Sequence, residues 1–466
     1  MAELPQNWIE CELQRLVDII NGYAFKSSLY VEKGYRIVRI TNVQKGFFVD
    51  TNPKFYAPTE DLQKYELKGD DILLSLTGNV GRVCIMPQKF LPAYLNQRVG
   101  CLRIKIEKCL NYKYLFYQLS TDEFEKICVQ NSRGNAQLNL GTEFVKTVNI
   151  KLPPLNEQKR IVEKLDKMMR IVDNVNARLD KIPTALKRAR QSILNQAITG
   201  ELTKDWREKN LDIIPASIMI EQFKQLLLES SSKNERDNIN NIFSYKENYF
   251  SFDIPHTWTF SILEKLCKSF KYGTSTKSES SGLVPVLRMG NIQKGEIDWN
   301  DLVYTSDSKE IEKYKLEKND VLFNRTNSPE LVGKTAIYRG ERAAIYAGYL
   351  IKIENYKILN SEYLNYALNS TFAKEWKLDV KTDGVSQSNI NAQKLAKFEV
   401  PLPPLEEQAE IVRRVKLAFE NLDIIESRYQ KAKEYFDKLT QSILNKAFRG
   451  ELVPQDPNDS PIKIPE

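Results

Sequence analysis

Residues 152–202 begin LPPLNEQKRIV and end QSILNQAITGEL, and residues 402–452 begin LPPLEEQAEIV and end QSILNKAFRGEL. The two blocks align without a gap, so each residue of the second copy has a number 250 higher than its equivalent in the first. A chain that contains one unit twice can fold around its own approximate two-fold axis. Duplex DNA has such an axis too, so an internal duplication is one way for a single chain to meet two half-sites.

Apolar residues recur in both blocks at alternating steps of four and three. The first copy has Ile161, Leu165, Met168, Val172, Val175, Leu179, Ile182, Leu186, Ala189 and Ile193, and the second has Ile411, Val415, Ala418, Leu422, Ile425, Tyr429, Ala432, Phe436, Leu439 and Ile443. This period of 3.5 residues is typical of a coiled coil. At roughly 1.5 Å per residue each seam would be about 50 Å long. We expect the two copies to pair; the alternative is an amphipathic helix packed on its own domain.

Pro183 interrupts the first seam at the position where the second copy has Lys433. A proline inside a helix costs about 3 kcal/mol because it removes a hydrogen bond and clashes with the preceding turn. The sequence therefore predicts a kink, or a restart with Pro183 at the first helical position, in the first copy only.

Composition limits the class of protein. With 466 residues, 42% hydrophobic and 28% charged, the chain suits a globular protein of more than one domain. No apolar run approaches the length of a membrane span, and the first residues do not resemble a signal peptide. Six cysteines without a CxxC pair predict reduced thiols, no metal and a cytoplasmic location. The net charge of +7 is compatible with nucleic acid without requiring it.

The segments outside the blocks are also repeated, in diverged form. RIVRITNVQKG ending at Gly46 matches PVLRMGNIQKG ending at Gly295, and LPQNW at 4–8 matches IPHTW at 254–258. Short β-rich runs broken by Gly, Asn and Pro predict a mixed α/β (α+β) fold for each segment. We predict six parts: 1–151, variable domain; 152–202, central helical region; 203–244, linker that starts helical and ends flexible; 245–401, second variable domain; 402–452, C-terminal helical region; 453–466, flexible tail.

The sequence offers no catalytic constellation. The only histidine, His256, corresponds to Gln6 in the first half, so the two equivalent domains do not share it as a catalytic base. Gly333-Lys334-Thr335 ends like a phosphate-binding loop, but Ser328 stands where that loop needs a glycine. No group of acids, cysteines or histidines has metal-ligand spacing. We therefore predict a non-catalytic chain without a cofactor or metal of its own.

Polar, basic and aromatic residues gather around the glycine-rich turns of both variable domains. Such residues can fork onto guanine, pair with adenine or neutralise phosphates. The candidates for DNA contact are Tyr23, Phe25, Lys26, Asn42, Asn79, Arg82, Arg98, Arg133, Asn135 and Gln137 in the first domain, and Tyr272, Thr274, Thr276, Arg288, Asn291, Arg325, Asn327, Lys334 and Gln387 in the second. Residues alike in both copies, such as Arg39 and Arg288, Asn42 and Asn291, or Gln137 and Gln387, are instead expected to hold the shared fold or to touch the DNA backbone. Asn and Gln near glycine often cap a turn.

The order variable–conserved–variable–conserved, with LPPLNEQ and LPPLEEQ opening the helices, resembles the specificity subunit of a Type I restriction-modification system. The strings QSILNQAITGEL with TKDW, and QSILNKAFRGELVPQDP, carry the same resemblance, which spans essentially the whole chain. It implies two target recognition domains that each read half of a bipartite DNA site. It also implies antiparallel conserved helices that act as a ruler between half-sites, through pairing residues such as Ile161, Leu165, Val172, Leu179, Ile193, Ile411, Val415, Leu422, Phe436 and Ile443.

The resemblance further implies partners. Two methyltransferase subunits would bind the conserved regions, restriction subunits would join through them, and S-adenosylmethionine, ATP and magnesium would belong to those partners. Three alternatives remain open from the residues alone. The chain could be a stand-alone bivalent DNA-binding protein, a methyltransferase or nuclease with its own recognition domains, or a coiled-coil scaffold without a DNA role.

Overall fold

The structure, a computed structural model, describes residues 4–134, 137–247, 252–384 and 387–464. The chain divides into two compact units: unit 1 is Met1–Asp180 with Tyr429–Glu466, and unit 2 is Lys181–Arg428. Each unit holds one variable domain and parts of both conserved blocks. The unit boundaries thus fall inside the predicted helical regions, because the helices in each unit share an apolar core with the domain.

Domain 1, the variable domain of unit 1, is built on short strands rich in branched residues, as the sequence predicts. Its four-stranded antiparallel sheet has the order β2 (Val17–Asn21), β8 (Val99–Ile104), β5 (Ile72–Ser75), β6 (Val83–Ile85). A second sheet has the order β4 (Phe55–Tyr56), β3 (Tyr35–Val38), β7 (Ala93–Leu95), in which β3 and β7 are parallel. The helices are α1 (Tyr112–Leu119), α2 (Asp122–Gln130) and α3 (Thr142–Lys146). Finally β1 (Ile9–Glu12) pairs antiparallel with β9 (Asn149–Leu152), which leads into the conserved helix.

Domain 2, the variable domain of unit 2, repeats this plan. Its six-stranded sheet has the order β11 (Cys267–Tyr272), β20 (Leu350–Asn355), β16 (Val321–Asn324), β18 (Thr335–Ile337), β14 (Glu296–Ile297), β13 (Ile292–Gln293). Two three-stranded sheets have the orders β15 (Val303–Thr305), β12 (Val284–Leu287), β19 (Ile345–Tyr346), and β17 (Thr326–Asn327), β22 (Ser388–Asn389), β21 (Thr382–Asp383). The pair β10 (Thr259–Ile262) and β23 (Glu399–Leu402) matches β1 and β9. The helices are α9 (Leu263–Leu266), α10 (Ser308–Tyr314), α11 (Ser361–Asn369), α12 (Thr371–Val380) and α13 (Ala392–Ala396).

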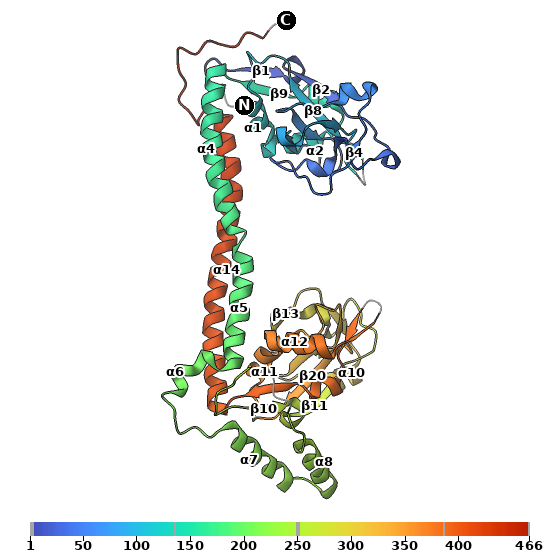
Figure 1. Cartoon of the computed structure of the whole chain (residues 1–466), viewed down its shortest axis with the longest axis vertical. Helices are drawn as coiled ribbons and strands as arrows, with labels where there is room; N and C mark the ends of the chain where they lie inside the picture. The colour runs from blue at the N-terminus through green and yellow to red at the C-terminus, as the bar shows by residue number, and fades with distance from the viewer. Residues whose placement is uncertain (1–3, 135–136, 248–251, 385–386, 465–466) are drawn as a thin grey trace. The chain divides into compact units, whose positions relative to one another are not determined.

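In unit 1, α4 (Leu155–Leu179) lies beside the C-terminal part of α14 (Leu405–Ala447), drawn in red in Figure 1. Lys433 forms an ion pair with Asp180 at 3.0 Å, and Val172 packs in one apolar cluster with Leu444. Residue numbers fall along one helix as they rise along the other. The two copies are therefore paired antiparallel in this unit.

In unit 2, α5 (Ile182–Thr199) lies beside the N-terminal part of α14 (Figure 1). Arg190 forms an ion pair with Glu426 at 3.4 Å, whereas Leu202, beyond the end of α5, accepts a hydrogen bond from Arg414 at 2.9 Å. This pairing is antiparallel as well. The prediction that the two copies pair is thus confirmed inside each unit.

Pro183 marks a restart of the helix, one of the two predicted outcomes. Helix α4 ends at Leu179, α5 begins at Ile182, and Pro183 lies in the first turn of α5. A first-turn residue has no intrahelical acceptor for its N–H, so proline costs little there. The second copy is continuous from Leu405 to Ala447.

Most predicted seam residues are buried or half-buried. Ile161, Leu165, Val172 and Ile443 lie in the core of unit 1, with Phe436 packed against it; Ile411 and Val415 lie in the core of unit 2, with Ile193 packed against it; Leu179 and Leu422 are half-buried. Ile425 departs from the prediction, because it is 45% exposed. The helices therefore bury their apolar stripe against each other and against the domains.

The linker and the tail are more ordered than predicted. The linker contains α6 (Lys204–Arg207), α7 (Ala216–Glu229) and α8 (Lys233–Phe243), and Ser232 and Glu235 form a capping box at the start of α8. A capping box satisfies two free N–H groups at a helix start, which explains how a polar segment keeps its helix. In the tail, Ile462 and Ile464 pack against the core of unit 1. The expectation of flexible ends was wrong for these described residues.

All six cysteines are unpaired and buried. Five of them, at positions 11, 84, 101, 109 and 128, belong to unit 1, and Cys267 belongs to unit 2. Burial raises the pKa of the Cys84 thiol and of the Cys128 thiol to about 12. Buried thiols with raised pKa values react slowly, because the thiolate is the nucleophile.

Candidate functional site

Two glycine-rich segments that are far apart in the sequence meet at one edge of domain 1. The backbone N–H of Gly78 donates to the Leu138 carbonyl at 2.8 Å, and Arg133 and Asn139 exchange two backbone hydrogen bonds of 2.9 Å. Asn79, Arg133 and Gln137 are exposed along this edge. We call these three residues cluster 1. Asn135, another candidate, lies outside the described residues.

The equivalent segments of domain 2 meet as the sheet β17–β22–β21. Asn389 Nδ2 donates to Thr326 Oγ1 at 2.9 Å, and the backbone N–H of Ile390 donates to the Arg325 carbonyl at 2.9 Å. This pairing brings the predicted residues Arg325, Asn327 and Gln387 together. We call these three residues cluster 2. No pattern in the sequence indicated directly that such distant turns are adjacent.

Arg325 is held in place by an aromatic ring. Its guanidinium carbon lies 4.9 Å from the centre of the Tyr272 ring, and the Tyr272 hydroxyl accepts a hydrogen bond of 3.0 Å from the Ala392 N–H. Arg325 Nε has no partner among the described residues, and Nη1 reaches only the Gly348 carbonyl at 3.4 Å. A stacked guanidinium is suited to acceptors that take two parallel N–H bonds, such as the edge of a guanine or a phosphate.

The two domains also share a contact between neighbouring loops. Arg82 Nη1 donates to Gln44 Oε1 at 3.0 Å in domain 1, and Lys334 Nζ donates to Gln293 Oε1 at 3.3 Å in domain 2. Each pair joins the segment after Asn42 or Asn291 to the loop after strand β5 or β16. These half-buried cations therefore have a positioning role that the sequence did not reveal.

Four predicted residues are buried and point into the protein. Asn42 and Asn291 are 3% and 2% exposed, and each accepts from the backbone N–H of the preceding arginine, Arg39 or Arg288, at 2.8 Å. Phe25 packs in an aromatic core. Thr274 is buried and donates to Glu310. Their prediction as direct DNA contacts is therefore corrected, because folding uses these groups.

The remaining candidates differ in how accessible they are. Arg288 is half-buried and donates to the Asp301 carbonyl at 2.6 Å, a structural contact. Lys26, Thr276 and Arg98 are exposed, as is Tyr23. The Arg98 carbonyl accepts a hydrogen bond from the Leu76 N–H at 3.1 Å, next to the turn that carries Asn79.

One exposed residue beside cluster 2 was missed. Tyr349 is 50% exposed, and its carbonyl accepts from the backbone N–H of Arg325 at 3.0 Å. It comes directly after Gly348, in the turn that corresponds to Gln97-Arg98 of domain 1. Because Arg98 is a candidate for DNA contact, its equivalent Tyr349 could have been predicted from the repeat.

Lys377 supports the loop of cluster 2 from inside the domain. The side chain is 5% exposed, and Nζ donates to the carbonyls of Gly333 and Leu368. Burial, together with the smaller effect of the Lys374 charge, lowers the pKa of Lys377 to about 7. Cys128 takes this place in domain 1, where it lies against Gly81 as Lys377 lies against Gly333.

The LPPL-x-EQ sequence that opens each conserved helix forms a buried anchor between helix and domain. Gln158 accepts from the Asn111 N–H at 2.9 Å and donates to the Cys109 and Pro153 carbonyls. Gln408 repeats this pattern with Asn360, Ile358 and Pro403. We predicted no role for these glutamines beyond marking the repeat, although identical polar residues after LPPL were a signal for one.

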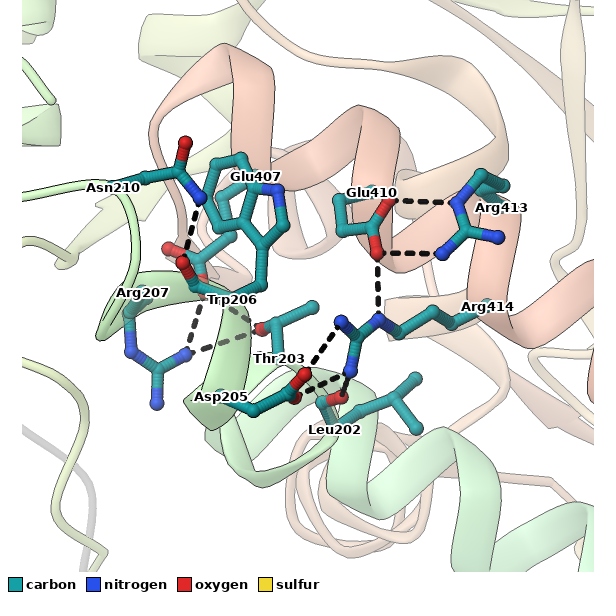
Figure 2. Close-up of polar contacts among 10 residues, drawn as sticks. All are labelled: Leu202, Thr203, Asp205, Trp206, Arg207, Asn210, Glu407, Glu410, Arg413 and Arg414. Atoms are coloured by element: carbon teal, nitrogen blue, oxygen red, sulfur yellow. Dashed lines mark hydrogen bonds and ion pairs between the residues drawn. The ribbon is translucent and has the colours of Figure 1, made fainter.

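The glutamate of the same motif differs between the units. Glu407, fully buried, accepts from Trp258 Nε1 at 2.7 Å, Thr203 Oγ1 at 2.7 Å and Arg207 Nη1 at 2.6 Å. Figure 2 shows Thr203 and Arg207 reaching it from the linker. Glu157 accepts only from Trp8 at 3.1 Å, and Oε1 has no partner among the described residues. Burial raises the pKa of Glu157.

A second arginine, Arg414 of α14, also holds the linker against this helix. Arg414 donates to Asp205 at 2.6 and 3.0 Å, to the Leu202 carbonyl and to Glu410 (Figure 2). In unit 1 the tail occupies the corresponding place, where Arg160 forms an ion pair of 2.7 Å with Asp459. The end of each conserved block is thus fixed to the start of the other copy.

Membrane spans and metal sites are both absent from the described part of the chain. None of the helices described is long and apolar enough to cross a membrane. Within the same residues, no group of three or more His, Cys, Asp or Glu side chains is placed to hold a metal ion.

Comparison with solved structures identifies the fold. The chain aligns with a TM-score of 0.67 and 18% identity to a chain from a study titled "Structural basis underlying complex assembly and conformational transition of the type I R-M system", covering 97% of this chain and 100% of that one. It aligns with a TM-score of 0.52 and 17% identity to the HsdS subunit from Thermoanaerobacter tengcongensis, covering 96% and 98%.

Comparison of sequences agrees. The chain is 30% identical over 466 residues to the Type I restriction enzyme EcoBI specificity subunit of Escherichia coli, covering 98% of this chain and 88% of that protein. It is 29% identical over 464 residues to the EcoKI specificity subunit of Escherichia coli strain K12, covering 97% and 91%. A family model, the Type I restriction modification DNA specificity domain, matches residues 5–184 and again 255–434. Because these two matches include well over half of the chain, it belongs to the family of Type I restriction-modification specificity subunits.

Proposed function

We propose that this chain is the DNA sequence-specificity subunit of a Type I restriction-modification complex. Each variable domain would bind one half of a bipartite site in double-stranded DNA. The observation that carries the proposal is the repeat itself: two domains with one plan present equivalent loop clusters, which share a glutamine, Gln137 or Gln387, and differ in their other side chains. Side chains that differ on a shared frame are what two different half-sites require.

Within each domain we assign base contact to residues of its cluster. Arg325, whose guanidinium stacks on Tyr272, is the strongest candidate for reading a guanine in the second half-site. Arg133 is the matching candidate in domain 1, because it is exposed at the edge where the glycine-rich segments meet. Gln137 has the same residue type as its equivalent Gln387, so we assign it to the shared fold or to the DNA backbone. Lys26, Arg98 and Thr276 are assigned to the phosphate backbone, which supplies affinity but little sequence discrimination.

The chain would act without catalysing a reaction. Two methyltransferase subunits would bind the outward faces of the conserved helices, and restriction subunits would join through them in the cytoplasm. S-adenosylmethionine, ATP and magnesium would be bound by those partners and not by this chain. The names of the relatives, both specificity subunits, support this division of labour.

The paired helices would also set the gap between half-sites. Inserting one heptad into each copy, between Asp180 and Lys181 and at the matching place in α14, adds about 10 Å of helix. The tolerated gap should then grow by about three base pairs of roughly 3.4 Å each. Inserting the heptad into one copy only is the control, since it breaks the pairing. An unchanged gap after the double insertion would contradict a ruler role.

Methylome sequencing tests the proposal. A host that expresses this chain with its methyltransferase should show a split motif with methylated adenines. Replacing 1–151 by the matching domain of a relative should change one half of the motif, and Arg325→Ala should relax one position of the other half. The untouched half serves as the internal control in both cases.

Experiments with the purified chain, alone and with its methyltransferase, distinguish the alternative functions. If the purified chain alone transfers labelled methyl groups from S-adenosylmethionine to DNA, it is an enzyme and the proposal is wrong. If it binds one sequence with full affinity and the methyltransferase adds nothing, it is a stand-alone DNA-binding protein.

A further inference from the structure

Each recognition domain sits on its own conserved helix through the same polar frame. Asn111 caps α1 and Asn360 caps α11, and the N–H of each is bound by the equivalent glutamine, Gln158 or Gln408. One turn further, Tyr114 donates to the Lys151 carbonyl at 2.9 Å, as Tyr363 does to the Pro401 carbonyl. These matched bonds fix which residues of the two units are equivalent.

Within this frame one ion pair has its charges exchanged. In unit 1, Lys113 of α1 contacts Asp166 of α4 at 2.7 Å. In unit 2 the equivalent residues are Glu362 of α11 and Lys416 of α14, also 2.7 Å apart. The domain carries the cation in one unit and the anion in the other. Neither pair can be formed by combining the domain of one unit with the helix of the other.

The basic residue in α1 is unfavourable for its own helix. Lys113 is the second residue of α1, where the unsatisfied N–H groups favour an acidic side chain. Glu362 at the same position of α11 obeys that preference. A lysine at this unfavourable position needs a stabilising contact from outside the helix, and the Asp166 carboxylate supplies it.

Second contacts reinforce each pair. Asp166 also accepts from the Tyr117 hydroxyl at 2.7 Å, and Glu362 also forms an ion pair of 2.6 Å with Arg339 of its own domain. Burial opposes ionisation of Glu362, but the bonds and charges of Arg339 and Lys416 together outweigh it and lower the pKa. Asp166 is 30% exposed and Glu362 is 11% exposed, so both pairs are partly shielded from solvent.

We infer that the charges of Asp166 and Lys416 determine which recognition domain each conserved helix accepts. A domain fits the first helix if the second residue of its docking helix is basic, and the second helix if that residue is acidic. Such docking of the chain's own domains does not depend on DNA binding.

A chain with two copies of domain 2 tests the rule. Replacing residues 4–151 by a copy of residues 254–401 places a glutamate, the copy of Glu362, against Asp166. Adding Asp166→Lys should restore the pair and raise the melting temperature of the chimaera by about 2–4 °C. Glu163→Lys is the matched control, since it makes the same change of charge at an exposed position of the same helix. The gain from Asp166→Lys should shrink at 1 M salt.

The natural chain gives a second test that does not require the chimaera to fold. Lys113→Glu and Asp166→Lys should each lower the melting temperature, and the double variant should recover most of the loss. Equal effects of Asp166→Lys and Glu163→Lys in the chimaera, or additive losses in the double variant, would overturn the inference. Methylation is not measured in either test, so a failure here is distinct from a failure of the proposed function.

Discussion

Glu157 and Glu407 are the same residue of one repeated motif, yet they lie in different surroundings. In unit 2 the chain continues into the linker, and Thr203 and Arg207 complete the hydrogen bonds of Glu407. In unit 1 the equivalent positions are Val453 and Pro457 of the tail, whose side chains cannot donate. The comparison teaches that duplication preserved the shape of the anchor, while its polar groups depend on the segment that comes after each block.

The largest difference is expected when the charge of each glutamate is removed in turn. Glu407→Gln should cost about 3 kcal/mol, because Arg207, with only 17% of its side chain exposed, loses its carboxylate. Glu157→Gln should change the free energy of unfolding by less than about 1 kcal/mol, because an amide avoids burying a charge with an unpartnered oxygen. Reaction of the buried thiols with a cysteine reagent reports the opening of each unit: Cys267 for unit 2, the other five for unit 1. Equal losses would break the comparison.

A second contrast concerns Lys377 and Cys128, which occupy equivalent buried positions. The pKa of Lys377 is lowered to about 7, so between pH 7 and 10 the unfolded chain binds more protons and stability rises with pH. The pKa of Cys128 is raised to about 12, so stability falls with pH above about 8.5.

Urea unfolding at pH 7 and pH 9 measures this contrast. The difference in unfolding free energy between Lys377→Met and the parent chain should shift in favour of the parent by on the order of 2 kcal/mol from pH 7 to pH 9. Cys128→Ser should move in the opposite direction by less than about 1 kcal/mol. A pH-independent difference for Lys377→Met would show that this amine does not titrate in the folded chain.

The carboxylates give a smaller contrast at acid pH. The pKa of Glu157 is raised by burial, so its contribution favours the folded state below the ordinary glutamate value and is lost as pH rises through the folded pKa. Burial opposes ionisation of Glu354 too, but hydrogen bonds from Ser269, Lys352 and Lys271 lower its pKa to about 2, so its contribution is lost as pH falls from about 4.3. Melting temperatures between pH 6 and 3 should therefore shift in opposite directions for Glu157→Gln and Glu354→Gln. Parallel shifts would contradict these assignments.

The smallest expected effect would make the two anchors more alike. Val453→Thr introduces at the tail the hydroxyl that Thr203 supplies in the linker. It should stabilise unit 1 by up to about 1 kcal/mol if it reaches Glu157 Oε1. The gain should disappear in the background of Glu157→Gln, which a double-mutant cycle measures. A gain that survives in that background would come from another contact.

The repeat made much of this fold predictable. The period of Ile161, Leu165 and Val172, with the same register in the second copy, was sufficient to predict paired helices. Backbone chemistry limited Pro183 to a kink or a restart, and the structure shows the restart. The tail was misjudged, because its isoleucines pack on a surface that only the folded unit provides. The composition of a segment does not reveal the surface against which that segment packs.

The candidate site was less predictable, for a different reason. Residue type made Arg325 and Asn42 equally good candidates for DNA contact. In the structure Arg325 stacks on Tyr272 in cluster 2, whereas Asn42 is buried in its own turn. Separating them needs the course of the backbone, which pairs the segment after Arg325 with residues 388 and 389. Ile425 shows the same limit for the helices, since an apolar residue in register is still 45% exposed.

The turns around Asn42 and Asn291 have one more consequence. Each asparagine ties both ends of its turn together, accepting from one arginine N–H and donating to a carbonyl seven residues further on, Val49 or Asp298. Its neighbours have changed between the copies, from Thr41 to Gly290 for example, without altering the loop. Substitutions at the exposed positions 41 and 290 should therefore leave the turn intact as long as the asparagine beside them is kept.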